Sequence, residues 1–243
     1  MDKNPLLEVR NLNVYYRDRR AKDTGGRQQV LQDVSFTVHE GEVLGLVGES
    51  GCGKTSLSRA VLGINKEIDG EIIHYGGQPR MVFQDPAASL NPAWSIGKIL
   101  EEPLRNAGVP KAERRVQAEQ MLEYVGLAAS WYDRKPRQLS GGQRQRVGIG
   151  AAIIGSPKFV IADEPVSALD VTIQAQILDL LVKLKEDLGL SYLFISHDMD
   201  VVWQICDNVM VMKDGCIVEY GTRDEVFDDP QHPYTKKLLN AAN

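Results

Sequence analysis

The sequence predicts an α/β fold built on a largely parallel β-sheet, with a block of helices inserted in the middle of the chain. Two observations support this prediction. Strand-like and helix-like patterns alternate in the first and last thirds of the 243 residues, whereas β-branched runs disappear between about residues 85 and 148. The composition, with 43% hydrophobic and 25% charged residues, is that of a globular protein and excludes the disordered and fibrous classes.

The first third is predicted to contain β-strands. Leu7–Val14 and Val34–Val38 alternate apolar and polar residues, as half-buried strands do. The charged, glycine-containing stretch Arg17–Gln29 between them is expected to be an exposed loop. Val43–Val47 is apolar throughout, which is typical of a strand that is buried on both faces of a sheet.

The middle third is predicted to be helical. Ala118, Met121, Leu122 and Val125 are spaced at i, i+3, i+4 and i+7, so they lie on one face of a helix. Gly126 follows at the position where a C-terminal helix cap belongs.

The last third returns to alternating strands and helices, which implies βαβ units. It has predicted strands at Phe159–Ala162 and Tyr192–Ile195, a long amphipathic helix between Ile173 and Leu188, a short helix at Val201–Ile205, and a final strand pair, Val209–Met212 and Ile217–Tyr220. The turn Lys213-Asp214-Gly215 joins that final pair.

Charge, cysteines and hydropathy exclude several classes of protein. The net charge of −5 argues against a dedicated nucleic-acid-binding protein. Three cysteines are too few for a secreted disulfide framework and favour a reducing compartment. The N-terminus lacks the apolar segment of a signal peptide, and no 18 apolar residues run together, so we expect neither secretion nor a membrane-spanning helix.

A phosphate-binding loop is predicted directly after the buried strand Val43–Val47. The loop matches G-x-x-x-x-G-K-[ST] in its required context, with a strand before it and a helix after it. Its glycines let backbone N–H groups turn inward around an anion, and the positive end of the helix points at the phosphates. The residues are Gly48, Glu49, Ser50, Gly51, Cys52, Gly53, Lys54 and Thr55, with Ser56 next in the helix. Lys54 is expected to reach the β- and γ-phosphates, and the Thr55 hydroxyl to bind Mg²⁺.

Two acidic residues end a second buried strand. Asp163 and Glu164 follow the apolar run Phe159–Ala162, at what would be the carboxyl end of a parallel strand beside the phosphate loop. In that position Asp163 would hold Mg²⁺, and Glu164 could polarise a water that attacks the γ-phosphate.

The phosphate loop and the acidic pair do not distinguish GTPases, kinases, helicases and transport ATPases. The Asn-Lys-x-Asp sequence that binds guanine is missing, because Asn65-Lys66 is followed by Glu67-Ile68, and this weakens the GTPase interpretation. The run from Ser140 to Gln143 supplies a second device for binding phosphate, a hydroxyl and bare backbone N–H groups at a predicted helix start. A chain with a phosphate loop and a second phosphate-binding helix start is expected to pair head to tail with a partner chain.

With this motif added, the sequence resembles the ATP-binding cassette (ABC) ATPases, the nucleotide-binding subunits of ABC transporters, over nearly the whole chain. The resemblance implies a P-loop fold with a RecA-like core and an antiparallel β subdomain in residues 1–85 and 158–243, and an inserted α-helical subdomain in residues 86–157. It also implies ATP and Mg²⁺ as cofactors.

Matching positions carry the family's roles over to this chain. Tyr16 resembles the aromatic residue that stacks on adenine, with Tyr15 as the alternative. Gln84 resembles the Q-loop glutamine, which contacts Mg²⁺ and the attacking water and senses the membrane subunits. His197 resembles the switch histidine, which contacts the γ-phosphate and orders that water.

The resemblance assigns a second set of residues to a neighbouring cassette. Ser140, Gly141, Gly142 and Gln143 resemble the signature motif, which contacts ATP held by the opposite protomer, and Asp170 resembles the D-loop aspartate, which crosses the dimer interface. The expected catalytic residues are Lys54, Gln84, Glu164 and His197, and the expected Mg²⁺ ligands are Thr55, Gln84 and Asp163.

Four stretches resemble the peptide and nickel branch of importers: residues 83–92, residues 139–147, residues 167–171, and the tail 229–239 with its His-Pro-Tyr-Thr element. The resemblance therefore predicts an ATPase subunit of an importer for oligopeptides, dipeptides or nickel complexes. Many peptide-type members have a long cysteine-bearing extension, whereas this sequence stops at Asn243. This difference slightly favours nickel complexes as the expected cargo.

The expected partners are a second ATPase subunit, identical or related, membrane permease subunits and, indirectly, an extracytoplasmic binding protein, but no nucleic acid. The permease contact is expected in residues 84–104 and the helical subdomain. The chain is expected to lie at the cytoplasmic face of the cell membrane. Two other interpretations are a soluble cassette ATPase acting on nucleic acid, ribosomes or an enzyme complex, and a regulatory cassette without turnover, against which Ser140, Glu164 and His197 argue.

Overall fold

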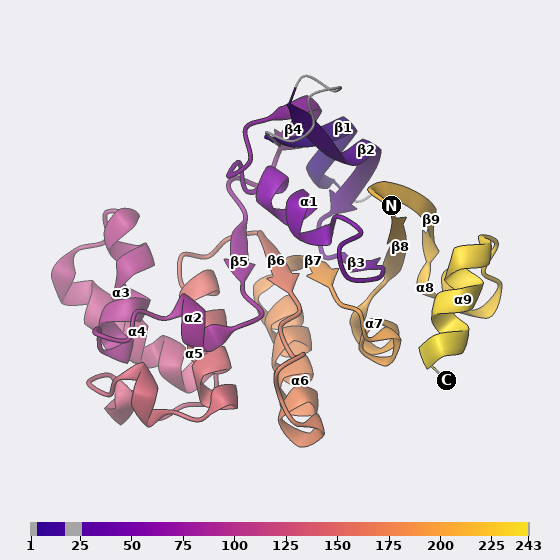
Figure 1. Cartoon of the computed structure of the whole chain (residues 1–243). Helices are drawn as coiled ribbons and strands as arrows, with labels where there is room; N and C mark the ends of the chain where they lie inside the picture. Colours follow the sequence, from indigo (N-terminus) through magenta and orange to yellow (C-terminus); the bar gives the residue numbers. More distant parts are fainter. Residues whose placement is uncertain (1–3, 18–25, 243) are drawn as a thin grey trace.

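The computed structural model describes residues 4–17 and 26–242 and contains two β-sheets and a group of helices to one side of them (Figure 1). The strands are β1 (Pro5–Arg17), β2 (Arg27–His39), β3 (Val43–Val47), β4 (Ile68–His74), β5 (Arg80–Val82), β6 (Phe159–Asp163), β7 (Ser191–Ile195), β8 (Asn208–Lys213) and β9 (Cys216–Thr222). The α-helices are α1 (Lys54–Val61), α2 (Pro86–Ser89), α3 (Ile96–Asn106), α4 (Lys111–Tyr124), α5 (Gly141–Ile153), α6 (Val171–Leu188), α7 (Met199–Ile205), α8 (Arg223–Asp228) and α9 (Pro233–Ala242), and the 3₁₀ turns are η2 (Ala129–Trp131) and η3 (Pro136–Gln138).

The larger sheet confirms the predicted parallel core. Its strand order is β5-β6-β7-β3-β8-β9. The neighbours from β5 to β8 pair in parallel, and β9 alone pairs antiparallel, with β8. The carboxyl ends of β3, β6 and β7 therefore lie at the same edge of the sheet, which is where open α/β sheets bind ligands.

Alternate residues of the larger sheet enter two different hydrophobic cores, so this sheet is the middle layer of the molecule. Tyr192 and Phe194 of β7 pack with α6, α7 and the helical part of the chain. Leu193 and Ile195 pack on the other face with α1 and the apolar residues of β1 and β2. Burial on both faces explains why these strands are continuous apolar runs.

The smaller sheet is antiparallel, with the order β2-β1-β4, and lies above α1 (Figure 1). It corrects part of the prediction of an exposed loop at Arg17–Gln29. Arg17 ends β1 and residues 27–29 begin β2, because Tyr15 pairs with Gln29 and Arg17 with Arg27. The rest of that stretch, residues 18–25, lies outside the described residues. Strands β4 and β5 had no counterpart in the prediction.

The helices α2 to α5 follow one another in the middle of the chain, as predicted. Gly126 lies just past α4 with a φ of 77°, the left-handed conformation of a helix cap, and Leu127 N donates to Leu122 O at 2.8 Å. The β8–β9 turn also agrees with the prediction, since Asp214 and Gly215 both have positive φ, as a two-residue hairpin turn requires. Among the described residues, no helix combines the length and the apolar character needed to cross a bilayer.

Candidate functional site

The loop after β3 holds its lysine close to its own backbone. Gly53 precedes α1 with a φ of 118°, which a residue with a side chain rarely adopts. The Lys54 side chain is buried, and its Nζ donates to Gly48 O at 2.7 Å and to Glu49 O at 3.1 Å. The ammonium therefore lies over the turn whose N–H groups and helix start form the predicted anion site.

All the predicted catalytic residues and Mg²⁺ ligands, together with part of the predicted phosphate loop, line one cleft of about 430 Å³. The lining residues are Ser50, Gly51, Lys54, Thr55, Gln84, Asp163, Glu164 and His197. They come from the carboxyl ends of β3, β6 and β7, from the start of α1 and from the loop after β5. Residues separated by up to 147 positions in the sequence are thus brought together by the parallel sheet.

Glu164 is held between two other cleft residues. Gln84 Nε2 donates to one carboxylate oxygen, Oε2, at 2.9 Å, and His197 Nδ1 lies 3.1 Å from the other, Oε1. The backbone of Glu164 has a φ of 46°, a conformation that costs about 1–3 kcal/mol in a residue other than glycine. Glu164 N donates to Ile195 O at 2.9 Å, which fixes this strained turn at the end of β6.

Asp163 is half-buried, and its pKa is raised. Burial is the main cause, and the neighbouring Glu164 carboxylate adds to it, while Lys54 and Arg59 act in the opposite direction. Together with the Thr55 hydroxyl and the Gln84 amide, Asp163 provides the hard oxygen donors that Mg²⁺ prefers. No group of three or more His, Cys, Asp or Glu residues that could hold a metal occurs in the described part of the chain. This donor set therefore suits an ion that is also bound by substrate phosphates.

The two candidate adenine residues face different parts of the molecule. The Tyr16 hydroxyl donates to Ser56 Oγ at 3.3 Å, which places that hydroxyl at the first turn of α1, directly after the phosphate loop. The Tyr15 hydroxyl interacts with Asp69 on β4 instead. Of the two, Tyr16 lies on the side of the loop.

The run from Ser140 to Gln143 forms the start of α5. Ser140 Oγ accepts from Gln143 N at 3.3 Å, and Gln143 Oε1 accepts from Ser140 N at 2.9 Å, a reciprocal capping box. A Cβ on Gly142 would overlap the Ile173 side chain of α6, whereas one on Gly141 would meet Leu169 at an ordinary 3.6 Å. Ser140 and Gly141 are exposed and are not among the lining residues of the described cleft.

Asp170 begins α6 close to this surface. Its carboxylate accepts from Ile173 N at 3.0 Å, so it caps the helix. The next residue, Val171, is 83% exposed.

Comparison with known proteins shows what this arrangement belongs to. The family model described as ABC transporter matches residues 31–167, more than half of the chain. A second model, described as the C-terminal region of oligopeptide/dipeptide transporters, matches residues 218–243. The chain belongs to the ABC transporter ATP-binding family. It is an ATPase of this family, and the family binds ATP, generally with Mg²⁺.

The relatives of this ABC ATPase include transport proteins that align with it over most of both chains. The dipeptide transport ATP-binding protein DppF of Haemophilus influenzae is 45% identical over 257 residues, covering 99% of this chain and 79% of the relative. The oligopeptide transport ATP-binding protein OppF of Bacillus subtilis is 41% identical over 254 residues, covering 97% and 82%.

Solved ABC structures share the fold of this ATPase. CbiO1 of Clostridium perfringens, part of the ABC transporter complex CbiONQ, superposes with a TM-score of 0.80 at 30% identity, covering 93% of this chain and 92% of that one. The ATP-binding cassette MJ0796, solved as a post-hydrolysis dimer with ADP and phosphate, gives 0.75 at 26% identity, covering 89% and 98%.

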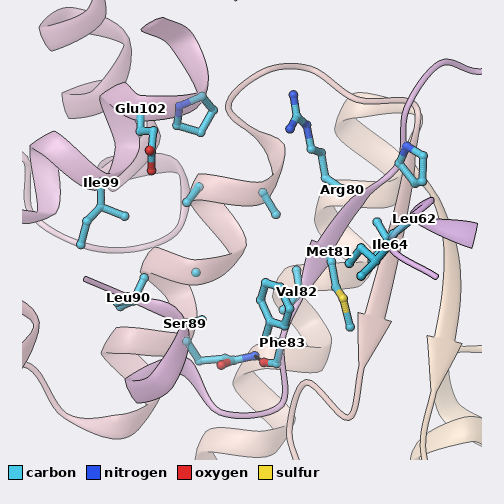
Figure 2. Close-up of a pocket in the computed structure, with 16 residues that line it drawn as sticks. Leu62, Ile64, Arg80, Met81, Val82, Phe83, Ser89, Leu90, Ile99 and Glu102 are labelled. Atoms are coloured by element: carbon cyan, nitrogen blue, oxygen red, sulfur yellow. Dashed lines mark hydrogen bonds between the residues drawn. The ribbon is translucent and has the colours of Figure 1, made fainter. Parts of the chain in front are cut away.

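A groove of about 380 Å³ lies next to the cleft of this ABC ATPase, between β5 and the helices α2, α3 and α5. Figure 2 shows Met81, Val82 and Phe83 on one side of it and Ile99 and Glu102 of α3 on the other. The groove and the cleft meet at the loop after β5, because Phe83 lines the groove and Gln84 lines the cleft.

Three residues of this region were not singled out by the sequence. Gln145 of α5 is buried, and its Nε2 donates to Phe83 O at 3.4 Å, so the signature helix supports the loop that carries Gln84. Arg59 of α1 lines a neighbouring cavity of about 480 Å³ together with Thr55, Gln84 and Asp163. The hydroxyl of Tyr234, from the C-terminal His-Pro-Tyr-Thr element, accepts from Glu49 N at 3.0 Å. Gln145 and Tyr234 lay in stretches that resemble the family, but neither stretch indicated these contacts, and Arg59 lay in no motif.

Proposed function

We propose that this ABC ATPase energises an importer of dipeptides or oligopeptides, and that each ATP is held between the phosphate loop of one cassette and the signature motif of another. The cleft that joins Lys54, Gln84, Asp163, Glu164 and His197 is the observation that supports the catalytic half of this proposal. The peptide cargo rests on the match of residues 218–243 and on the names of the DppF and OppF relatives. Nickel complexes stay a prediction from the resemblance.

In this proposal Lys54 and the loop N–H groups bind the β- and γ-phosphates, and Tyr16 stacks on adenine. The Ser56 hydroxyl, next to Thr55, lies at the same helix start. Thr55, Gln84 and Asp163 hold Mg²⁺, which when bound neutralises charge on the phosphate oxygens. The half-buried Asp163 carboxylate favours a cation, because burial penalises its uncompensated charge.

Glu164 is the proposed base. A water between Glu164 and the γ-phosphate would transfer a proton toward the carboxylate while its oxygen attacks phosphorus. The bond from the γ-phosphorus to the oxygen that bridges to the β-phosphate would break, and ADP would leave with that oxygen. Gln84 and His197 orient the carboxylate from both sides. Because Nδ1 of His197 faces Glu164, Nε2 is the ring nitrogen that can face the γ-phosphate and stabilise its developing charge.

The second half of the ATP site is proposed to come from another cassette, identical or related. Ser140, Gly141, Gly142 and Gln143 are the residues proposed to contact the γ-phosphate there. The exposure of Ser140 and Gly141 and the exposed Val171 beside Asp170 support this surface as the meeting face. In a C₂ dimer, two phosphate loops would face two signature helices.

The groove beside β5 is the proposed seat of the permease subunits. It mixes apolar side chains, of which Phe83 is 49% exposed, with the charged Arg80 and Glu102 (Figure 2). A permease segment in this groove would press on Phe83, and the next residue, Gln84, would pass that movement to Glu164. We therefore propose residues 86–157 as the lobe that carries the signature and the helical side of the docking groove. We propose the inner face of the cell membrane as the place of action.

Transport by the reconstituted importer tests the cargo. Vesicles that contain this chain, its permease and the second cassette, with their binding protein outside, are given labelled dipeptide, labelled oligopeptide or a nickel chelate. We expect peptide uptake that requires ATP inside the vesicle. Uptake of the nickel chelate alone would refute the peptide assignment, and ATP hydrolysis that no permease stimulates would favour the soluble, non-transport interpretation.

A further inference from the structure

The C-terminal helix reaches the phosphate loop through one tyrosine. Tyr234 stands in the first turn of α9, is 7% exposed, and accepts a hydrogen bond from Glu49 N at 3.0 Å. This hydrogen bond joins two residues that are 185 positions apart in the sequence. Neither the loop nor the helix uses it for its own backbone hydrogen bonds.

The two ends of one peptide group join Tyr234 to Lys54. The N–H of Glu49 and the carbonyl of Gly48 belong to the same planar unit and point in opposite directions. Tyr234 binds the N–H end, and the Lys54 ammonium donates to the carbonyl end at 2.7 Å. Rotation of this peptide would therefore break both hydrogen bonds together.

The tyrosine is itself firmly placed. His232 Nδ1 accepts from Tyr234 N at 3.1 Å and caps the start of α9. The Glu219 carboxylate of β9 accepts from Gln231 N at 2.6 Å and from His232 N at 3.1 Å. The ammonium of Lys213 lies 5.2 Å from the centre of the Tyr234 ring, within the range of a cation–π interaction.

The β8–β9 hairpin supports the loop from a second side. Gly215 N donates to Cys52 O at 2.9 Å, and Gly48 packs so closely on Met212 O that a Cβ would not fit there. The hairpin therefore restricts Gly48, at one end of the Gly48–Glu49 peptide. The tail holds the N–H at the other end through Tyr234.

We propose that Tyr234 is a positioning residue for Lys54, acting through the Gly48–Glu49 peptide, so that docking of α9 and binding of the ATP phosphates strengthen each other. The proposal rests on the proposed role of Lys54 in phosphate binding. Because the coupling is reciprocal, ATP must stabilise the docked tail by the same factor by which the tail raises ATP affinity.

Tyr234→Phe is the sharpest variant, because it removes the hydroxyl and keeps the ring. Equilibrium binding of a non-hydrolysable ATP analogue with Mg²⁺ should weaken by about 2- to 10-fold, the usual effect of one lost neutral hydrogen bond. Exchange of the Glu49 amide hydrogen should become faster in the same variant. Tyr220→Phe, on the half-exposed ring of β9, is the matched control and should change neither.

A double-mutant cycle separates positioning from general support. In a Lys54→Ala background, Tyr234→Phe should change analogue affinity less than it does in the wild type, because the group that it positions is gone. Equal effects in both backgrounds, or wild-type affinity and amide exchange in Tyr234→Phe, would overturn the proposal. If the wild-type chain itself fails to bind the analogue, the proposed function fails instead, so the two failures are distinguishable.

If Tyr234→Phe proves unstable, proteolysis of the wild type gives a second measurement. Cleavage within α9 should slow when the analogue is added to the wild type and should slow less in Lys54→Ala. An equal effect of the analogue on both chains would contradict the proposed coupling.

Discussion

The nucleotide cleft and the signature surface use the same device, a glycine-containing turn at the start of a helix, but they differ in what surrounds it. At the start of α1, side chains from three other segments converge on the turn and enclose a cleft. At the start of α5, the turn is capped by its own Ser140 and Gln143 and faces outward. One chain thus has an enclosed cleft that holds the proposed phosphate and metal residues and, separately, an exposed helix start that is proposed to bind an anion, and this difference is the physical reason to propose a second cassette.

The largest expected effect tests the cleft. Glu164→Gln keeps the size of the side chain and its hydrogen-bonding capacity but removes the base, so the rate of ATP hydrolysis should fall by about 10²- to 10⁴-fold while ATP still binds. Steady-state hydrolysis and equilibrium binding, measured on the same preparation, check this. Glu186→Gln, an exposed change on α6, is the control. Hydrolysis near the wild-type rate in Glu164→Gln would show that another group is the base.

The next effect compares two adjacent glycines of the signature surface. Gly142→Ala forces a methyl group into Ile173 of α6 and should cost about 1–3 kcal/mol of unfolding free energy, as overpacking does. Gly141→Ala places its methyl group at an ordinary distance from Leu169 and should leave stability nearly unchanged, but it should lower hydrolysis if Gly141 faces ATP of a partner. Thermal unfolding and ATPase assays of the two variants check the pair. Equal destabilisation of both variants would contradict the close packing of Gly142 against Ile173.

The smallest expected effect compares two helix caps of the same kind. Ser140 and Thr222 each form a capping box, at the starts of α5 and α8. Replacing either by Ala should cost about 1 kcal/mol of stability. Only Ser140→Ala should also reduce ATP hydrolysis, because Thr222 caps a helix that the proposal places outside the ATP site. A loss of activity in Thr222→Ala that matches the loss in Ser140→Ala would reduce the role of Ser140 to capping.

The sequence predicts the buried parallel strands well because burial on both faces leaves a continuous apolar run. The predicted strand at Tyr192–Ile195 differs from β7 by one residue, and the predicted strand at Phe159–Ala162 differs from β6 by one. Strand β4 escaped prediction because Asp69, Gly70 and Glu71 give it no apolar pattern, and its pairing with β1 is what makes it a strand. The three-residue strand β5 is too short to give a period.

The cleft residues could be found from motifs, because each motif sits at the end of a strand whose place in a parallel sheet is predictable. What the sequence could not give is contact between segments without a shared period. The bond from Glu49 N to Tyr234 and the bond from Gln145 to Phe83 O join parts of the chain 185 and 62 residues apart. Such contacts depend on how α9 and α5 pack, which only the folded chain shows.

Dimer formation by Glu164→Gln tests the proposed sharing of the ATP site most directly. With Mg²⁺ and ATP, this variant should shift from monomer to dimer in sedimentation, alone or mixed with the second ATPase subunit of its transporter, and ADP should not produce the shift. Adding Ser140→Arg to the same variant should return the monomer while ATP still binds to the phosphate loop. A Glu164→Gln chain that binds ATP and stays monomeric in both mixtures, or a dimer that Ser140→Arg leaves intact, would contradict the account.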